Sequence, residues 1–278
     1  MDAQQLMVTA SDGSQLAVTR WSAPGPAVVL LHAGVADRRS WTTVADALQG
    51  DGLDLIAYDR RGYGDTPAAA DSSSFTHVDD LLHVMDELAL DRALLVGNSM
   101  GGAVALDTAL LHPDRVSEVV LIGAAVSGMT DEDTPFDWEP DDASAPLMAR
   151  ADDPTVADDD RIRALAHLWL DGPGAAEGRV AGDVRALFEA MNRKILAAAA
   201  PDSAGSAGVD AWTRLGEATV PVLCTWGDLD LPCDVPFYKE TARRIGQGAG
   251  RVLPDVAHLP SLEQPVLIAE MVRSAAHH

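Results

Sequence analysis

The chain has 278 residues and a formal net charge of −23, and 47% of its residues are hydrophobic. This composition is that of a globular protein, and the length suffices for one large α/β domain with an insertion or for two domains. So acidic a chain repels nucleic acid and anionic membranes, so we expect neither as a partner. No apolar run has the length of a membrane span and the first residues lack a signal-peptide pattern, which predicts a cytoplasmic protein.

The first half of the chain alternates apolar runs with helical patterns. Two short runs at 6–10 and 16–21 flank Asp12-Gly13, a hairpin signal. Four continuous apolar runs then follow, as is typical of strands buried on both faces of a parallel sheet. They occupy residues 27–31, 53–58, 94–96 and 119–122. The helical patterns between them lie at 41–48, 76–90 and from about 100 to 112.

This alternation stops after Gly128 and resumes at residue 220. The stretch between contains no convincing strand, but it has helical patterns at 161–170 and 184–196. A strand, a helix, a short strand and a last helix complete the chain. They are predicted at 220–226, at 236–245, at 251–253 and through Ile268 and Met271. We therefore predict a mainly parallel, doubly wound α/β sheet, formed by residues 1–128 and 220–278, with an inserted helical cap at 129–219.

A serine follows the run at 94–96 in the pattern G-x-S-x-G. Gly97, Ser99 and Gly101 form this pattern, which marks a sharp strand-to-helix turn that presents a serine hydroxyl. Only small residues fit two positions before and after so crowded a turn. The helix that starts there leaves its first N–H groups free, so the N–H of Met100 is a natural donor to an oxyanion. Alone the pattern is weak, because glycine-rich turns also occur as plain connections.

The loop after the first buried strand lies at the same edge of the predicted sheet. The backbone N–H of Gly34, or as a second choice Val35, is placed to face the same point as Met100. Together two such donors would form an oxyanion hole. We interpret His32 as a structural residue that braces this loop. The charged turn at 59–64 is likewise interpreted as structural, with ion pairs and glycine bends at a sheet edge.

An aspartate and a histidine follow later strands and complete a constellation with Ser99. A serine hydroxyl is a poor nucleophile at neutral pH and needs a base, and the base needs a carboxylate that fixes its tautomer. His258 is the candidate base, and Asp228 and Asp230 are the candidate carboxylates. The order Ser, Asp, His is that of the α/β-hydrolase fold.

The chain resembles the α/β-hydrolase superfamily over nearly all of its length outside the cap. The motifs that carry the resemblance are L-L-H-A-G at 30–34, D-R-R-G-Y-G at 59–64, G-N-S-M-G-G at 97–102, H-P-D-R-V at 112–116, W-G-D-L-D at 226–230 and A-H-L-P-S-L-E-Q-P at 257–265. The resemblance implies a catalytic triad of Ser99, Asp230 and His258, because the family pattern G-x-x-D falls on Asp230 and leaves Asp228 as a surface or loop residue. It also implies an oxyanion hole formed by the N–H groups of Gly34 and Met100. The chain departs from the family at Ala33, where a glycine is usual.

Several activities fit such a site, all on a small molecule. The first is a serine carboxylesterase that acts on a small, neutral ester. The second is a lactonase, because the segment at 257–265 is similar to that of 3-oxoadipate enol-lactonases. The third is a carbon–carbon bond hydrolase, since the elbow is similar to that of meta-cleavage product hydrolases, although the H-A-G-V-A-D loop and Leu259 depart from their pattern. The fourth is a catalytically silent binding protein, which the complete triad disfavours.

Other relatives of this fold are separated by the residue at the elbow. Epoxide hydrolases and haloalkane dehalogenases use an aspartate there, so Ser99 argues against both. Hydroxynitrile lyases and cofactor-free oxygenases share the triad and are not excluded by it. The two cysteines, Cys224 and Cys233, form no disulfide framework and have no metal-like partner nearby, so we expect no cofactor and no metal ion. The sequence does not indicate an oligomeric state.

The predicted cap contains an acidic stretch. Twelve acidic residues lie between Asp131 and Asp160, and Arg150 is the only basic residue among them. If part of this stretch faces the mouth of the site, its field would repel an anionic substrate. The alternative is a solvated outer face with no role in selection.

Overall fold

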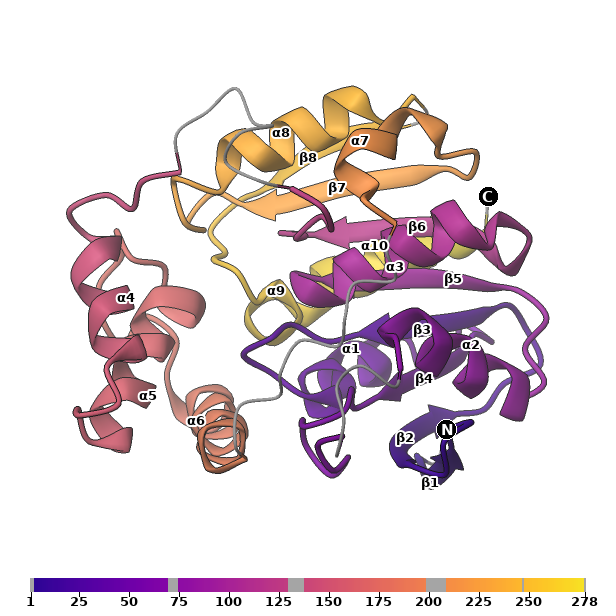
Figure 1. The fold of residues 1–278 in the computed structure, drawn as a ribbon, viewed down its shortest axis with the longest axis horizontal. Coiled ribbons are helices and arrows are strands. Elements are labelled where there is room, and N and C mark those ends of the chain that lie inside the picture. Colours follow the sequence, from indigo (N-terminus) through magenta and orange to yellow (C-terminus); the bar gives the residue numbers. More distant parts are fainter. Residues whose placement is uncertain (1–2, 70–74, 130–137, 199–208, 247, 278) are drawn as a thin grey trace.

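Eight strands form one sheet in the order β1-β2-β4-β3-β5-β6-β7-β8 (Figure 1). The computed structural model describes residues 3–69, 75–129, 138–198, 209–246 and 248–277. The strands are β1 (Gln4–Thr9), β2 (Gln15–Trp21), β3 (Ala27–Leu31), β4 (Asp54–Tyr58), β5 (Ala93–Asn98), β6 (Val116–Ile122), β7 (Val222–Gly227) and β8 (Gly248–Leu253). The β1–β2 and β2–β4 pairs are antiparallel, and the remaining pairs are parallel. The predicted fold class is confirmed.

The continuous apolar runs form the central strands because both faces of the sheet are covered. In β3, Val29 and Leu31 belong to the apolar cluster on one face, whereas Val28 and Leu30 belong to the cluster on the other. Successive side chains of a strand point to opposite faces, so a strand covered twice needs apolar residues at every position.

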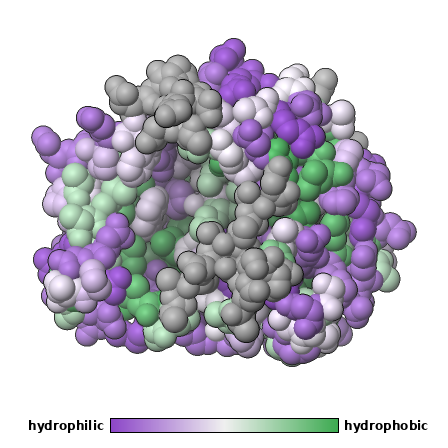
Figure 2. All heavy atoms as spheres, in the orientation of Figure 1, coloured by the Kyte–Doolittle hydropathy of each residue, from purple (hydrophilic) through white to green (hydrophobic). Residues whose placement is uncertain are grey.

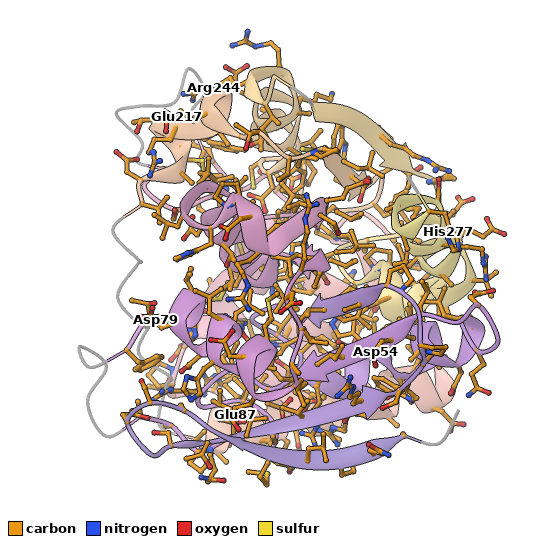
Figure 3. The ribbon with its side chains drawn as sticks, turned by 90° about the vertical axis from the view of Figure 1, so that its right-hand side faces the viewer. Asp54, Asp79, Glu87, Glu217, Arg244 and His277 are labelled. Atoms are coloured by element: carbon orange, nitrogen blue, oxygen red, sulfur yellow. The ribbon has the colours of Figure 1, made fainter. Side chains whose placement is uncertain are left out.

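Helices cover the two faces separately. They are α1 (Thr42–Ala47), α2 (His77–Glu87), α3 (Met100–Leu111), α7 (Ala211–Arg214), α8 (Val235–Arg244), α9 (Pro260–Glu263) and α10 (Pro265–Ala276), with 3₁₀ turns η1 (Arg38–Trp41), η3 (Pro113–Arg115) and η6 (Leu215–Glu217). Helices α2, α3, α7 and α8 supply residues to one apolar cluster, and α1 and α10 supply the other. Figure 3 shows this division, with Asp79 of α2 and His277 at the end of α10 on opposite sides of the sheet.

Three helices lie apart from this sandwich, between β6 and β7 in the sequence. They are α4 (Ser144–Asp152), α5 (Asp158–Ala166) and α6 (Gly182–Ala197), and they lie together beyond the strand ends to which the arrows of β6 and β7 point (Figure 1). The sequence predicted α5 and α6 but not α4. Residues 209–219, which the sequence placed in the cap, contribute Trp212 and Leu215 to the cluster of the core. The proposed cap is therefore formed by α4 to α6.

The cap meets the core through a third apolar cluster. Its core members come from the loop after β3 and from the segment around α9, and its cap members come from α5, α6 and the turn between them. The buried residues are Ala33, Ala36, Leu259, Leu262, Ala166, Leu170, Phe188 and Met191. In Figure 2 hydrophilic residues on the cap side are interspersed with some hydrophobic ones, and further hydrophobic side chains appear in the hollow beside it. Within the described ranges no helix has the length and apolarity that crossing a membrane requires.

The close approach of α3 to β3 gives a test of the fold. A methyl group added at Gly101 would meet the carbonyl oxygen of Leu31 and lie 2.8 Å from that of His32. We expect Gly101→Ala to lower the free energy of unfolding by about 1–3 kcal/mol, measured by urea denaturation. Helix propensity alone would favour alanine by about 1 kcal/mol, so a loss identifies the steric contact. Gly174→Ala is the control, because a methyl group there has nothing within 4 Å. Equal stability of the two variants would contradict the packing described.

Candidate active site

Ser99 lies at the turn between β5 and α3 in a backbone conformation that is rare for a residue with a side chain. Its φ is 54° and its ψ is −120°. Such a conformation is strained and persists only when the surroundings hold it. Here the N–H of Ser99 donates to the carbonyl of Ile122 at 2.9 Å, and its own carbonyl accepts from the N–H groups of Gly102 at 2.8 Å and Ala125 at 3.1 Å. The turn is thereby tied to the end of β6.

The glycines around Ser99 stand where other residues would clash. A methyl group at Gly97 would lie 2.6 Å from the Cα of Gly102, and one at Gly102 would meet the side chain of Ala124. The sequence pattern predicted this crowding. The side chain of Asn98 continues the connection, because its amide donates to the carbonyl of Ile122 at 2.9 Å and to that of His258 at 3.0 Å.

His258 and Asp230 form a buried pair. The Nδ1 of His258 lies 3.0 Å from Oδ1 and 2.9 Å from Oδ2 of Asp230, and each residue is only 4% exposed. Burial by itself lowers the pKa of His258. The charge and hydrogen bond of Asp230, together with the charges of Asp234 and Glu263, more than offset burial, so the pKa of His258 is raised. This environment favours an imidazole that takes up a proton.

Of the two candidate carboxylates, the structure brings Asp230 and not Asp228 to the histidine. Asp230 also accepts from the N–H of Leu231 at 2.8 Å, and its side chain is buried. Asp228 is exposed. Gly123 has a φ of 48°, and a methyl group on it would lie 3.0 Å from Oδ2 of Asp230 and 3.2 Å from Nδ1 of His258. The end of β6 therefore leaves room for the pair only because it has no side chain there.

Two residues beside the pair were not identified from the sequence. The hydroxyl of Tyr238 donates to Oδ2 of Asp230 at 3.2 Å and lies 3.4 Å from Oδ2 of Asp234. Burial, followed by the charges of Asp230 and Asp234, raises the pKa of Tyr238 far above its ordinary value, so the hydroxyl stays protonated as a donor. The indole of Trp138 donates to the other oxygen of Asp234 at 2.7 Å. No local motif marks either position.

The loop expected to form the oxyanion hole lies against the start of α3. A methyl group on Gly34 would lie 2.7 Å from Sδ of Met100 and 3.8 Å from the hydroxyl of Tyr63. The amide of Asn192, from the cap, donates to the carbonyl of Val35 at 2.9 Å. Gly34 and Met100 are thus neighbours, and their role as paired N–H donors stays a prediction.

His32 has both ring nitrogens engaged within the core. Its Nδ1 lies 2.8 Å from the carbonyl of Ala33, and its Nε2 accepts from the backbone N–H of Arg60 at 3.0 Å. Burial, followed by the charge of Arg60, lowers the pKa of His32 well below its ordinary value, which keeps the ring neutral. These contacts support the interpretation of His32 as a brace between two loops.

The charged turn after β4 contains the ion pairs predicted for it. Asp59 accepts from the N–H groups of Arg38 and Asp65, each at 2.8 Å. The guanidinium of Arg61 pairs with Asp80 at 2.7 Å and with Asp12 at 2.5 Å. The turn therefore anchors the loops at this end of the sheet.

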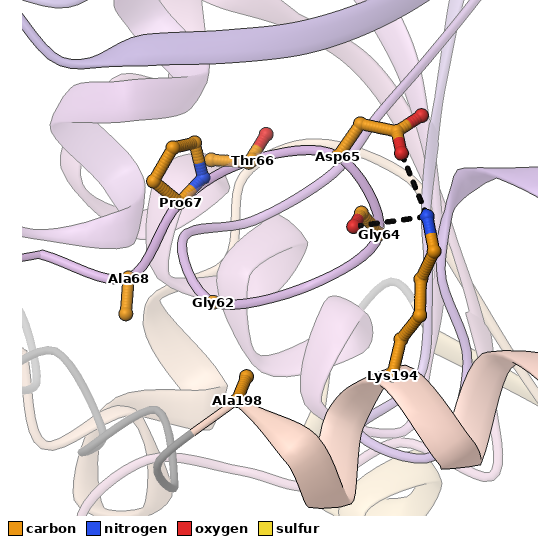
Figure 4. A pocket seen from close by; sticks show the side chains of 8 residues that line it. All are labelled: Gly62, Gly64, Asp65, Thr66, Pro67, Ala68, Lys194 and Ala198. Atoms are coloured by element: carbon orange, nitrogen blue, oxygen red, sulfur yellow. Dashed lines mark hydrogen bonds and ion pairs between the residues drawn. The ribbon is translucent and has the colours of Figure 1, made fainter.

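A separate hollow lies between this turn and the cap (Figure 4). It has a volume of about 260 Å³, and Ser99, Asp230 and His258 are not among the residues that line it. Nζ of Lys194, on α6, donates to Oδ1 of Asp65 at 2.7 Å and lies 3.5 Å from the carbonyl of Gly64. The hollow is thus a feature of the seam between cap and core. Within the described ranges no group of three or more His, Cys, Asp or Glu side chains is arranged so that it could hold a metal ion.

Comparison with known proteins agrees with this architecture. The profile of the alpha/beta hydrolase fold matches residues 26–265. A Bacillus subtilis (strain 168) protein with the provisional name 2-succinyl-6-hydroxy-2,4-cyclohexadiene-1-carboxylate synthase is 28% identical, over 95% of this chain and 96% of its own. The pimeloyl-(acyl-carrier protein) methyl ester esterase of Vibrio atlanticus (strain LGP32) is 27% identical, over 91% of this chain and 96% of its own.

Among solved structures, an esterase from Exiguobacterium antarcticum superimposes with a TM-score of 0.79 at 22% identity, over 99% of this chain and 100% of its own. At this identity the likeness shows the fold alone. The profile match, which spans most of the sequence, shows the family. The chain belongs to the alpha/beta hydrolase fold family of hydrolases.

Proposed function

We propose that this protein is a serine hydrolase that cleaves a small, neutral carboxylic ester through an acyl-enzyme on Ser99. The observation that carries the proposal is the buried pair of His258 and Asp230, which shares an edge of the sheet with the strained turn at Ser99. A relative of similar length, the methyl ester esterase of Vibrio atlanticus, supports an ester as the substrate class.

The proposed reaction has two halves. The Oγ of Ser99 attacks the ester carbonyl while Nε2 of His258 takes the hydroxyl proton, and the imidazolium is stabilised by Asp230. The N–H groups of Gly34 and Met100 hold the oxyanion, and the alcohol leaves with the proton from His258. A water molecule then gives a proton to His258 and attacks the acyl group. The second tetrahedral intermediate collapses, His258 returns its proton to Oγ, and the acid is released.

A neutral substrate is supported by the apolar junction between cap and core. Residues of the loop after β3 and of α9 meet Phe188 and Met191 of the cap in one cluster. Arg60, beneath that loop, is only 1% exposed and is covered by the ring of Tyr63, with its Cζ 4.7 Å from the ring centroid. The guanidinium of Arg60 is therefore not accessible for an ion pair with a substrate carboxylate.

The acidic stretch of the cap is partly described. Asp131, Glu132, Asp133 and Asp137 lie outside the described residues. The other acids are exposed or half-buried on or beside α4 and α5, where Asp160 pairs with Arg150 at 3.1 Å and Asp159 pairs with Arg193 at 2.6 Å. These positions fit a solvated outer face. The alternative is that the acidic stretch repels anionic substrates at the entrance of the site. Kinetics with a neutral and an anionic ester distinguish the two.

The first test concerns the nucleophile. We expect Ser99→Ala to lower kcat for p-nitrophenyl acetate by a factor on the order of 10⁶, because the members of a triad act as a unit. The exposed Ser274, on α10, gives the matched control, and Ser274→Ala should leave turnover unchanged. Circular dichroism should show that both variants are folded. If Ser99→Ala keeps most of its activity, Ser99 is not the nucleophile.

The second test distinguishes the two aspartates. Asp230→Asn should lower kcat by about 10⁴-fold, because the histidine loses the carboxylate that fixes its tautomer and stabilises its charged form. Asp228→Asn should have little effect, since that side chain is exposed. Steady-state kinetics of both variants with one ester would measure the difference. A greater loss in Asp228→Asn would reverse the assignment.

The third test concerns substrate charge. If the cap repels anions, kcat/KM for p-nitrophenyl acetate should exceed that for mono-p-nitrophenyl succinate, and the ratio should shrink between about 10 mM and about 500 mM salt. Changing the exposed Asp158 and Asp159 to asparagine should reduce the ratio at low salt. Equal values at low salt, or a preference for the anion, would reject steering and place an enol-lactonase ahead of the esterase.

A further inference from the structure

The cap reaches the catalytic loops through an unusual helical turn. Helix α5 ends at Ala166 and continues as a π-helical turn, η5 (His167–Asp171), which ends at Gly172 with a φ of 89°. A methyl group on Gly172 would meet the carbonyl oxygen of Leu229, so the turn packs against the loop that carries Asp230. Single π-helical turns are rare and occur frequently at functional sites. This one places a wide helical turn directly beside the triad.

The side chain that this turn presents to the triad is Trp169. Its ring centroid lies 4.6 Å from that of His258, with the planes inclined at 50°. Its carbonyl oxygen accepts a hydrogen bond from the backbone N–H of His258 at 3.3 Å. The same cap residue therefore contacts both the ring and the backbone of the proposed base. Trp169 itself is half-buried, whereas His258 is almost fully buried.

The turn is held rigidly by its own last residue. The carboxylate of Asp171 is fully buried, accepts from the N–H groups of Gly178 at 2.8 Å and Val180 at 2.9 Å, and pairs with Arg185. A buried carboxylate so fully paired restricts the loop that follows, because removing any partner would leave a charge unsatisfied.

A second link joins the cap to the segment that carries His258. Arg179 pairs with the buried carboxylate of Glu263 and donates to the carbonyl of Asp255 at 3.2 Å. Glu263 in turn accepts from the N–H of Ala257, the residue before His258, at 3.0 Å. The cap thus holds the segment on both sides of the histidine.

We propose that Trp169 is a positioning residue for His258. In this proposal the π-helical turn of the cap holds the imidazole in the orientation that the base needs. The indole and the carbonyl of Trp169 restrict the imidazole to the orientation in which it meets Asp230, and the indole keeps water from the ring. The inference rests on the proposed function, because it takes His258 as the base.

Removing the indole has a predictable effect on protonation. The charged or titratable groups around His258 are Asp230, Asp234, Tyr238, Glu263 and, paired with the last, Arg179. A substitution of Trp169 leaves all of these in place, so a change in the pKa of His258 reports the loss of the ring.

The expected direction of that change is upward. Water that reaches the imidazole stabilises the charged form, so the pKa of His258 rises from its already raised value. The lost contact between cation and indole opposes this change, and we expect the gain in hydration to exceed it. Because the neutral imidazole is the base, the acid limb of the kcat/KM profile moves to higher pH.

The experiment compares Trp169→Leu and Trp169→Phe with Leu165→Ala. Leu165 packs against the same apolar cluster as Trp169 and serves as the control for loss of apolar packing alone. With p-nitrophenyl acetate, Trp169→Leu should lower kcat by about 10- to 100-fold, since misplacement of a catalytic group by about 1 Å has this effect. Trp169→Phe should restore most of kcat, because it keeps an aromatic ring. Leu165→Ala should leave the pH profile unchanged.

An independent measurement follows His258 in the free enzyme. Titration of its imidazole by NMR should show a pKa higher in Trp169→Leu than in the unaltered protein by about half a unit or more. An unchanged titration together with a change in KM only would show that Trp169 is a wall of the site and would overturn the proposal. Trp169→Met replaces the leucine variant if circular dichroism shows that the latter does not fold.

The same titration separates the two hypotheses. If esters are not cleaved in a manner that depends on Ser99, the proposed function fails, whatever Trp169 does. A shifted His258 titration would then still report the contact with Trp169. If esters are cleaved and neither kcat nor the titration responds to Trp169→Leu, the positioning role fails and the esterase proposal stands.

Discussion

The candidate site depends on the sharp turn that the backbone makes between β5 and α3. Ser99 adopts a positive φ there, and such strain persists only where other contacts hold it. The hydrogen bond to Ile122 ties the turn to β6, and the glycines on either side let α3 approach the neighbouring strands. Because β3, β5 and β6 are adjacent and parallel, the loops after them end at the same edge. The position of the serine is therefore a property of three strands and a helix together.

Burial of charge organises the second half of the site. Asp230 is buried but has the imidazole of His258, a backbone N–H and the hydroxyl of Tyr238 as partners. In a low-dielectric surrounding the attraction between a carboxylate and an imidazolium is strong. The raised pKa of His258 follows from this arrangement. Other acids that contribute to the net charge of −23 are exposed, for example Asp158 and Asp159 on α5.

The cap contacts the core in two chemically different ways. Its apolar side chains meet the loop after β3 and the region of α9, whereas buried ion pairs fix the loop after the π-helical turn. Apolar contacts are not directional, but a buried ion pair is, so the second kind of contact determines where the cap residues stand relative to His258. The directional ion pairs explain how a helical insertion can hold the indole of Trp169 against the imidazole of His258.

The sequence by itself determined the alternation of strands and helices and the elbow at Ser99, whereas the preference for Asp230 over Asp228 came from the resemblance to a family. These features reside in short stretches, where a periodic pattern or a glycine spacing reports a local backbone requirement. Helix α4 was not predicted because its local signal is weak. It has nine residues, a proline in its first turn and little apolar periodicity. Only the tertiary structure decided that Tyr238 would meet Asp230 and that Trp169 would meet His258. Trp169 and His258 lie on distant segments that packing and ion pairs bring together, whereas Tyr238, eight residues after Asp230, meets it because α8 packs on the sheet. No pattern within these elements encodes the partner.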